Sequence, residues 1–146
     1  GRRAYLATAQ ALDLEMENRI AKHQADRGPA WHATIEEPLK LSAALKTNSK
    51  IFDIILVDCI TLWLSNLMGR GDSDQHILKE IAELTQSLGE LSTTVILVSN
   101  EVGLGLVPDH PAGRRFRDLA GIANQRLAQA CSEVYFTIWG LPQKLK

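Results

Sequence analysis

Two side chains in the sequence combine reactive chemistry with a suitable setting, and the first is Asp58. It directly follows the apolar run 54–57 (IILV). A carboxylate at the carboxyl end of a buried parallel strand is typical of nucleotide enzymes that hold Mg2+, usually through water, beside the β- and γ-phosphates. An apolar strand that ends in aspartate is also common as a cap or turn, so this residue alone leaves both interpretations open.

The second side chain is His23, near the end of a predicted helix. It lies one turn beyond Ile20, and three cationic residues are close in sequence: Arg19, Lys22 and Arg27. A histidine here can interact with the negative C-terminal end of its helix. Alternatively, a neutral imidazole nitrogen can attack a phosphorus atom and form a phosphoramidate, while the neighbouring cations offset the charge on the phosphate.

Two further groups of residues can contact a base, a ribose or a phosphate. Glu36 and Glu37 precede Pro38 and can either cap the next helix or accept hydrogen bonds from a ligand. Arginines around Phe116 can clamp phosphates or form a solvated face: Arg114, Arg115 and Arg117. The other histidines have no metal-ligand spacing and are interpreted as surface residues: His32, His76 and His110.

Strands that alternate with helices must position these residues. Apolar runs predict strands over 4–9, 54–58, 94–98 and 133–139. Helical spacing predicts helices over 13–23 with Asp13 as the cap, from Pro38 onward, over 60–68, over 75–88 and through 116–130. The segment 24–37 is expected to be a loop. The strands 54–58 and 94–98 are expected to be buried, the first of them on both faces. The strand 133–139 is expected to close the sheet.

This order of elements predicts an α/β fold with a mainly parallel sheet and helices on both faces. Ligands of such folds bind at the carboxyl ends of the strands. Three of the predicted strands end there in polar residues: Thr8, Asp58 and Asn100–Glu101. We therefore expect the site at this edge of the sheet.

Length and composition limit the classes of protein. With 146 residues, of which 45% are hydrophobic, the chain is expected to form one domain, 1–146. Sixteen Lys and Arg balance 17 Asp and Glu, so the basic face that nucleic-acid binding needs is not predicted. Cys59 and Cys131 lie in apolar stretches and are interpreted as buried thiols in a reducing compartment, the cytoplasm. No apolar run is long enough to span a membrane.

One motif expected beside Asp58 cannot be found. The phosphate-binding loop G-x-x-x-x-G-K-[ST] requires a Gly-Lys pair, and none occurs in the sequence. The chain also begins with Gly1 and not with methionine. We therefore expect a domain truncated at its N-terminus, with the first strand and the phosphate loop upstream of Gly1.

Several stretches together resemble one family, the bifunctional adenosylcobinamide kinase/adenosylcobinamide-phosphate guanylyltransferases of cobalamin biosynthesis. They are YLATAQALDLEMENRIAKH, the loop through Arg27 and Trp31 to EEP, ILVDCITLWLSNL and SNEVGLGLVPDHPAGRRFRDLAGIANQRLA. They run in family order across nearly the whole chain. The last stretch is long and specific, so it carries most of the resemblance.

The resemblance implies a P-loop, RecA-like fold and two reactions. In one, ATP or GTP phosphorylates adenosylcobinamide. In the other, GTP transfers GMP to a histidine, and adenosylcobinamide phosphate then takes up the nucleotide to give adenosylcobinamide-GDP. Mg2+ as the metal and a homotrimer as the assembly are also implied.

The resemblance also assigns roles by position. His23 is similar to the guanylylated histidine, and Asp58 takes the position on the magnesium side. The implied nucleotide contacts are Ala7, Thr8, Ala9, Gln24, Ala25, Asp26, Arg27 and Glu36, with Glu37 open as the alternative to Glu36. Contacts with phosphate or the corrinoid are implied at Asn100, Glu101, Arg114 and Arg117.

Two other functions compete with this one. A different P-loop ATPase, for example a RecA-like enzyme acting on nucleic acid, requires a basic groove, which the charge balance of the chain disfavours. A loop-less, non-catalytic homologue would retain only nucleotide binding or a role in assembly.

The missing Gly-Lys pair leads to a first prediction. We expect residues 1–146 by themselves not to catalyse phosphoryl transfer efficiently, because this chemistry consists mostly of positioning and charge stabilisation. The measurement compares kinase activity of residues 1–146 with that of a version carrying the loop. Equal activities would refute the requirement for the loop.

Overall fold

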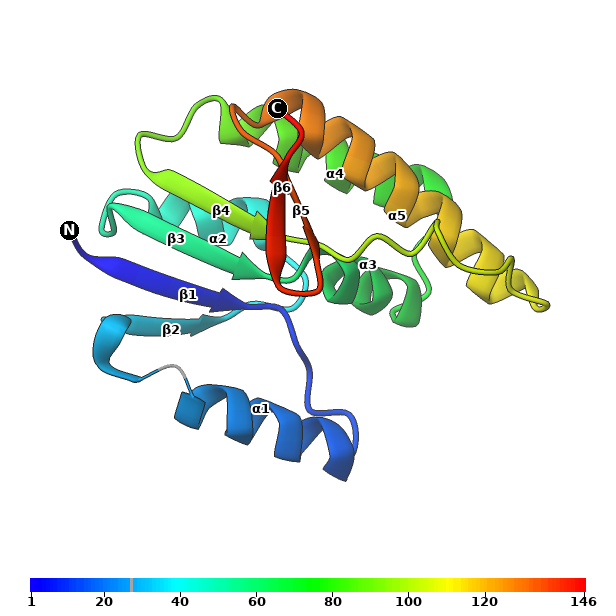
Figure 1. The fold of residues 1–146 in the computed structure, drawn as a ribbon, viewed down its shortest axis with the longest axis horizontal. Helices are drawn as coiled ribbons and strands as arrows, with labels where there is room; N and C mark the ends of the chain where they lie inside the picture. Colours follow the sequence, from blue (N-terminus) through cyan, green and yellow to red (C-terminus); the bar gives the residue numbers. More distant parts are fainter. Residues whose placement is uncertain (27) are drawn as a thin grey trace.

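The computed structural model describes residues 1–26 and 28–146, apart from the side chain of Asp26. Strands and helices alternate over most of this length (Figure 1). The elements are β1 (Arg3–Ala7), α1 (Leu14–Asp26), a short 3-10 helix (Gly28–Ala30), β2 (Ala33–Glu36), α2 (Leu41–Asn48), β3 (Ile54–Asp58), α3 (Ile60–Gly69), α4 (Asp74–Leu88), β4 (Thr94–Val98), α5 (Pro111–Ala130), β5 (Tyr135–Ile138) and β6 (Leu141–Lys144).

The main sheet has four parallel strands in the order β2-β1-β3-β4. β1 is central and pairs with β2 on one side and β3 on the other. In its last row, Ala7 lies between Glu36 and Asp58, and Asp58 lies opposite Val98. The predicted α/β class with a parallel sheet is confirmed.

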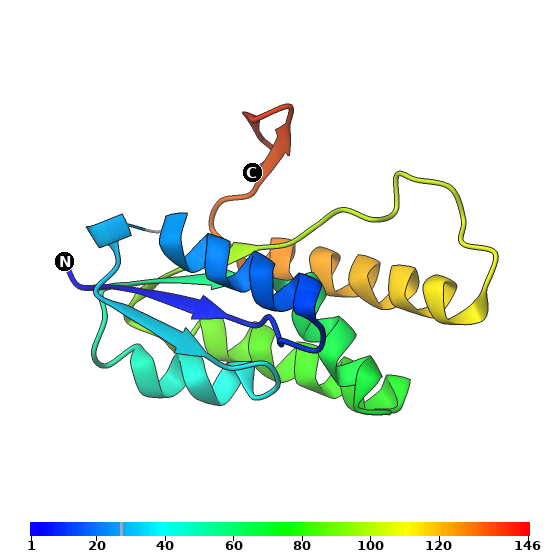
Figure 2. The ribbon, with the colours of Figure 1, turned by 90° about the horizontal axis from the view of Figure 1, so that it is seen from below.

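The core lies between one face of the sheet and the helices behind it. Leu6, Ile55 and Val57 point to this face and are fully buried, and so is Trp63 of α3. Figure 2 shows α2, α3 and α4 on this side, while α1 lies on the other side of the sheet. α5 packs along α4 and α3. Helices therefore flank both sides of the sheet, but unequally.

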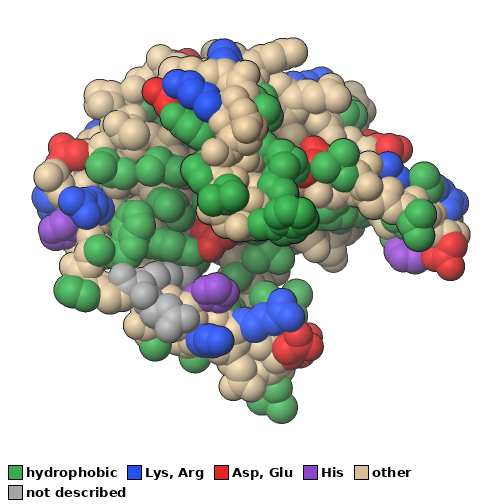
Figure 3. All heavy atoms as spheres, in the orientation of Figure 1, with side chains coloured by type: hydrophobic (Ala, Val, Ile, Leu, Met, Phe, Trp, Pro, Cys, Tyr) green, Lys and Arg blue, Asp and Glu red, His purple; other side chains and the backbone are tan. Residues whose placement is uncertain are grey.

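The opposite face of the sheet is partly open, so the prediction that 54–58 and 94–98 are buried strands is wrong. Alternate residues of β3 are only half-buried, and Ile96 and Val98 of β4 are 46% and 37% exposed. Figure 3 shows hydrophobic side chains gathered on this face. The physical reason is that α1 lies toward β2 and leaves the β4 side uncovered.

Three predicted elements differ from the structure. The expected loop 24–37 contains the last turn of α1 and the edge strand β2, which has only one strongly apolar residue, Ile35. α2 begins at Leu41 and not at Pro38. Residues 133–139 do not close the sheet, because β5 pairs with β6 through a two-residue turn, Trp139–Gly140. Both turn residues have positive φ (53° and 76°), as a tight hairpin requires.

Both cysteines are free thiols, and one of them is buried. Cys59 is buried and Cys131 half-buried, and both are free. Burial raises the pKa of the Cys131 thiol above its ordinary value, so the neutral form is favoured. Among the described helices, none has the length and apolar character needed to cross a membrane.

Trp63 provides a test of the core. Its indole nitrogen donates a hydrogen bond to the Leu39 carbonyl at 2.9 Å while the ring is fully buried. We expect Trp63→Phe to lower the free energy of unfolding by about 1–3 kcal/mol, because the carbonyl loses its partner. Urea denaturation measures this. Trp139→Phe, at a side chain 96% exposed, is the matched control and should change stability by less than about 0.5 kcal/mol. Equal losses of stability in the two variants would contradict a stabilising role of the Trp63–Leu39 hydrogen bond.

Candidate functional site

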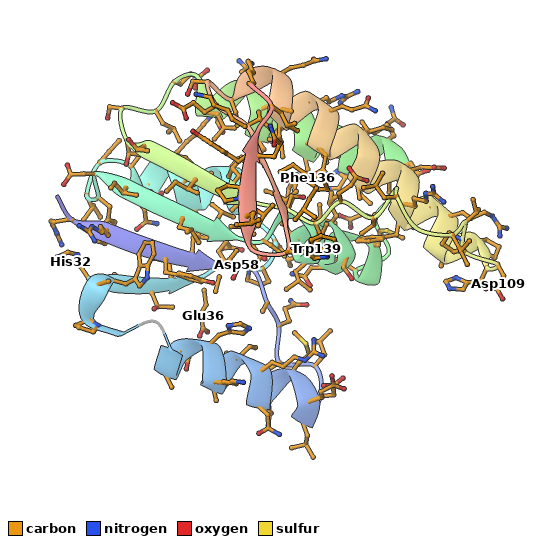
Figure 4. The ribbon with its side chains drawn as sticks, in the orientation of Figure 1. His32, Glu36, Asp58, Asp109, Phe136 and Trp139 are labelled. Atoms are coloured by element: carbon orange, nitrogen blue, oxygen red, sulfur yellow. The ribbon has the colours of Figure 1, made fainter. Side chains whose placement is uncertain are left out.

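A pocket of about 260 Å3 lies between α1 and the open face of the sheet, at the carboxyl ends of the strands. Side chains from α1, β1, β2, β3 and α3 contribute to it. Figure 4 shows Glu36 and Asp58 at the strand ends beside this space. The lining residues are Ala7, Ala9, Ala11, Met16, Arg19, Ile20, His23, Gln24, Glu36, Asp58 and Leu62.

The strand register brings the two carboxylates together. Glu36 and Asp58 both lie opposite Ala7, so all three side chains leave the same face of the sheet. The two carboxylate-bearing strands are two interstrand spacings apart, roughly 10 Å. The small side chain of Ala7 between them leaves room for a ligand group.

Tyr5 orients the Asp58 carboxylate. It lies two residues before Ala7 on the same face of β1, and its hydroxyl donates a hydrogen bond to Oδ2 of Asp58. The Tyr5 ring is largely buried and packs edge-on against Trp31, with 5.5 Å between ring centroids. The carboxylate is therefore held by a side chain that is itself fixed.

One face of α1 forms the opposite wall. Met16, Ile20 and His23 repeat at helical spacing and all line the pocket, as does Arg19. The predicted cap is confirmed, because Oδ1 of Asp13 accepts a hydrogen bond from the Met16 amide at 2.8 Å. Met16 and Ile20 repeat at helical spacing in the sequence. In the structure they are half-buried and face the pocket.

The two glutamates have different environments. Glu36 lines the pocket, and its Oε1 accepts a hydrogen bond of 3.4 Å from Nε2 of Gln24 on α1. Glu37 instead binds the backbone amides of Leu39 and Lys40 at 3.0 and 2.7 Å, just before α2. Of the two, only Glu36 faces the pocket.

Thr8 lies behind the pocket and joins β1 to β3. Its hydroxyl donates to the Cys59 carbonyl at 2.7 Å and accepts from the Cys59 amide at 2.8 Å, and the side chain is fully buried. Its own amide donates to the Asp58 carbonyl at 3.0 Å. Ala7 and Ala9, on either side of Thr8, line the pocket.

Other predicted residues lie outside the pocket lining. Asn100 donates to the Thr61 hydroxyl at 3.0 Å, and Glu101 accepts from the Gly103 amide at 2.6 Å. Arg114 and Arg117 donate to loop carbonyls, those of Pro108 and Gly103, at 3.0 and 2.6 Å. Figure 4 shows Asp109, in the same loop, at the far end of the molecule from Glu36.

The remaining predicted nucleotide contacts are Ala25, Asp26 and Arg27. Ala25 is exposed on α1 and is not among the lining residues. Arg27 and the side chain of Asp26 lie outside the described residues. His32, interpreted as a surface residue, is exposed, and its Nδ1 accepts a hydrogen bond from the Arg3 amide at 3.1 Å, at the amino end of the sheet.

The donor chemistry of the pocket fits Mg2+. Carboxylates are the protein ligands that this ion prefers, and it retains several waters. Asp58 and Glu36 are the carboxylates of the lining. Within the described residues, no group of three or more His, Cys, Asp or Glu is gathered as a complete metal cage.

Several residues of the site were not predicted. Tyr5 reaches the site through the strand register, and Leu62 through the packing of α3. Neither the register nor this packing can be read from the sequence. Arg19 and Met16 had a usable signal, since both share a helix face with His23 at spacings of four and seven residues.

The fold and site define an α/β protein with a pocket, lined by both charged and apolar side chains, at the carboxyl ends of its parallel strands. Residues 1–145 match the family described as cobinamide kinase / cobinamide phosphate guanyltransferase (CobU). The chain belongs to this family.

Curated relatives agree with this match. The chain is 48% identical over 143 residues to the bifunctional adenosylcobalamin biosynthesis protein CobP of Pseudomonas aeruginosa, with 98% of this chain and 82% of that protein covered. It is 38% and 36% identical to the bifunctional adenosylcobalamin biosynthesis proteins CobU of Salmonella typhimurium and Escherichia coli, with 97% of this chain and 84% of each protein covered.

Thr8 allows a test of the strand junction behind the pocket. Thr8→Val keeps the shape but removes the hydroxyl, which leaves the buried amide and carbonyl of Cys59 without this partner. We expect a loss of about 2 kcal/mol or more in the free energy of unfolding, measured by urea denaturation. Thr94→Val, at an exposed position of β4, is the control and should be neutral or slightly stabilising. A neutral Thr8→Val would show that the junction does not depend on these bonds.

Proposed function

We propose that the protein is a cobalamin-biosynthesis enzyme with two activities. It phosphorylates adenosylcobinamide with ATP or GTP, and it transfers GMP from GTP to adenosylcobinamide phosphate through a guanylylated His23, giving adenosylcobinamide-GDP. The observation that carries the proposal is the presence of His23, Gln24, Glu36 and Asp58 in one pocket at the carboxyl ends of parallel strands.

In the guanylyl transfer, a ring nitrogen of His23 attacks the α-phosphorus of GTP. An N–P bond forms, the bond to the leaving oxygen breaks, and pyrophosphate departs. A phosphate oxygen of adenosylcobinamide phosphate then attacks the same phosphorus, and the N–P bond breaks to release the imidazole. In this proposal Arg19, one turn before His23 in the same pocket, offsets charge on the phosphate and exchanges its ion pair with Glu15 (2.9 Å) for the ligand.

The remaining pocket residues bind and orient the nucleotide in this proposal. Glu36 accepts hydrogen bonds from the base or ribose, which is supported by its position in the pocket and by the engagement of Glu37 with backbone amides. Ala7 and Ala9 offer backbone and space beside it, and Gln24 holds the Glu36 carboxylate. Asp58 would hold Mg2+, through water, and this ion would neutralise phosphate charge.

We also propose that a phosphate-binding loop completes the site on a further strand beside β4, which makes residues 1–146 part of a single nucleotide-binding domain. β4 is the edge of the described sheet, so its outer backbone groups have no strand partner there, and Ile96 and Val98 are exposed. The match to the Pseudomonas protein covers 82% of that protein, which is compatible with such a segment.

The family resemblance also supports the proposed phosphate or corrinoid contacts and the homotrimer. In this proposal, phosphate or the corrinoid binds against the loop after β4 and the start of α5, with contacts from Asn100, Glu101, Arg114 and Arg117. The Nη1 atom of Arg117 is buried without a hydrogen-bond partner among the described residues. The homotrimer rests on the resemblance alone, and sedimentation analysis tests it. The proposed cytoplasmic location rests on the two free thiols, Cys59 and Cys131.

The covalent histidine gives the decisive test. We expect the protein, expressed from its natural start codon, to take up label from GTP labelled at the α-phosphate, and His23→Ala to abolish this label. Because the bond is a phosphoramidate, the label should be lost in acid and retained in alkali. His32→Ala, at the opposite end of the sheet, is the control and should label normally. Persistent label in His23→Ala would remove this residue from its role, and an unlabelled wild-type protein would favour a non-catalytic binding homologue.

A further inference from the structure

Asn66 lies in α3 behind the pocket and joins two of its walls. Its Nδ2 atom donates to the carbonyl of Thr8 at 2.7 Å and to the carbonyl of Pro38 at 3.0 Å. A side-chain amide nitrogen carries two hydrogens, and each of these bonds uses one. We propose that Asn66 is a positioning residue that sets the separation of the ends of β1 and β2, two strands whose last residues line the nucleotide pocket. This rests on the function proposed above.

The two carbonyls belong to segments that form the pocket. Thr8 lies between Ala7 and Ala9, which line it, and Pro38 is two residues after Glu36, which also lines it. Asn66 itself is not among the lining residues. It therefore acts on the site only through the backbone positions that it holds.

Other contacts also fix the segment after β2. One comes from α3, the helix that carries Asn66, and the others come from Glu37 within the segment itself. Trp63, one turn before Asn66, binds the Leu39 carbonyl, and the Glu37 carboxylate binds the amides of Leu39 and Lys40. Just past the paired end of β2, the Glu37 amide donates a hydrogen bond to the Ala7 carbonyl at 3.0 Å. Asn66 adds a side-chain connection one residue further along both segments, at Thr8 and Pro38.

The chemistry of this position selects asparagine. Two carbonyl oxygens face one atom, so that atom must be a double donor. Aspartate has nearly the same shape but presents only acceptors, and its charge would face two carbonyl oxygens. Asn66→Asp should therefore separate the two segments with little change in side-chain volume.

A less organised pocket binds its ligand more weakly, because ordering must then occur on binding. For Asn66→Asp we expect the KM for GTP in covalent labelling to rise by about fivefold or more, with kcat changed by less than about threefold. A merely structural role would lower stability without this selective rise in KM.

The experiment uses the protein expressed from its natural start codon, with Asn66→Asp, Asn66→Ser and Asn48→Asp. Asn48 is the matched control, since its Nδ2 donates to the Ala44 carbonyl at 2.8 Å within α2, away from the pocket. Asn66→Ser keeps one donor on a shorter side chain, leaves room for water, and provides a folded variant if Asn66→Asp does not fold. Thermal unfolding confirms folding, initial labelling rates give KM and kcat, and calorimetry gives the Kd for GTP.

Weaker GTP binding in the Asn66 variants, with wild-type binding in Asn48→Asp, is the expected result. A folded Asn66 variant with wild-type KM and Kd overturns the positioning role. Calorimetry separates this outcome from failure of the proposed function: absence of covalent label in the wild-type protein refutes the guanylylated histidine, while the Kd values still test Asn66.

Discussion

Parallel pairing of β1 with both β2 and β3 is the constraint on which the rest of the site depends. The common register places Glu36, Ala7 and Asp58 in one row on one face, at the edge where the strands end. Because strand side chains alternate, a shift of one residue in either pairing would turn a carboxylate toward the core. The buried bonds of Thr8 to the backbone of Cys59 hold the β1–β3 pair at this register.

The two faces of the sheet divide packing from ligand binding. Leu6, Ile55 and Val57 face the helices and are fully buried, so burial of apolar area stabilises the sheet from that side. The other face carries Tyr5, Glu36 and Asp58, and α1 covers it only in part. A pocket with charged side chains can persist there because the core on the opposite face already holds the strands in place.

The organisation of the pocket depends both on side chains that line it and on side chains behind it. Tyr5 fixes Asp58, Gln24 links α1 to Glu36, and Asn66 joins the segments after β1 and β2. Each of these contacts connects elements that are distant in sequence. The positions of the carboxylates are therefore a property of the packed sheet and its helices, and not of any single loop.

The sequence by itself determined the α/β class, most helices, the cap at Asp13 and the family, because apolar periodicity, capping chemistry and long specific stretches are local properties. It also singled out His23, Glu36 and Asp58 as candidates. It did not reveal β2, whose four residues carry one strongly apolar side chain, or the hairpin of β5 and β6, which the left-handed turn at Trp139 and Gly140 sets apart from the sheet. Tertiary structure alone decided that Glu36 and not Glu37 faces the pocket, that Leu62 lines it, and that Tyr5 and Asn66 hold its parts. These outcomes depend on strand register and on contacts across 24 to 58 residues of sequence, for which a linear pattern contains no signal.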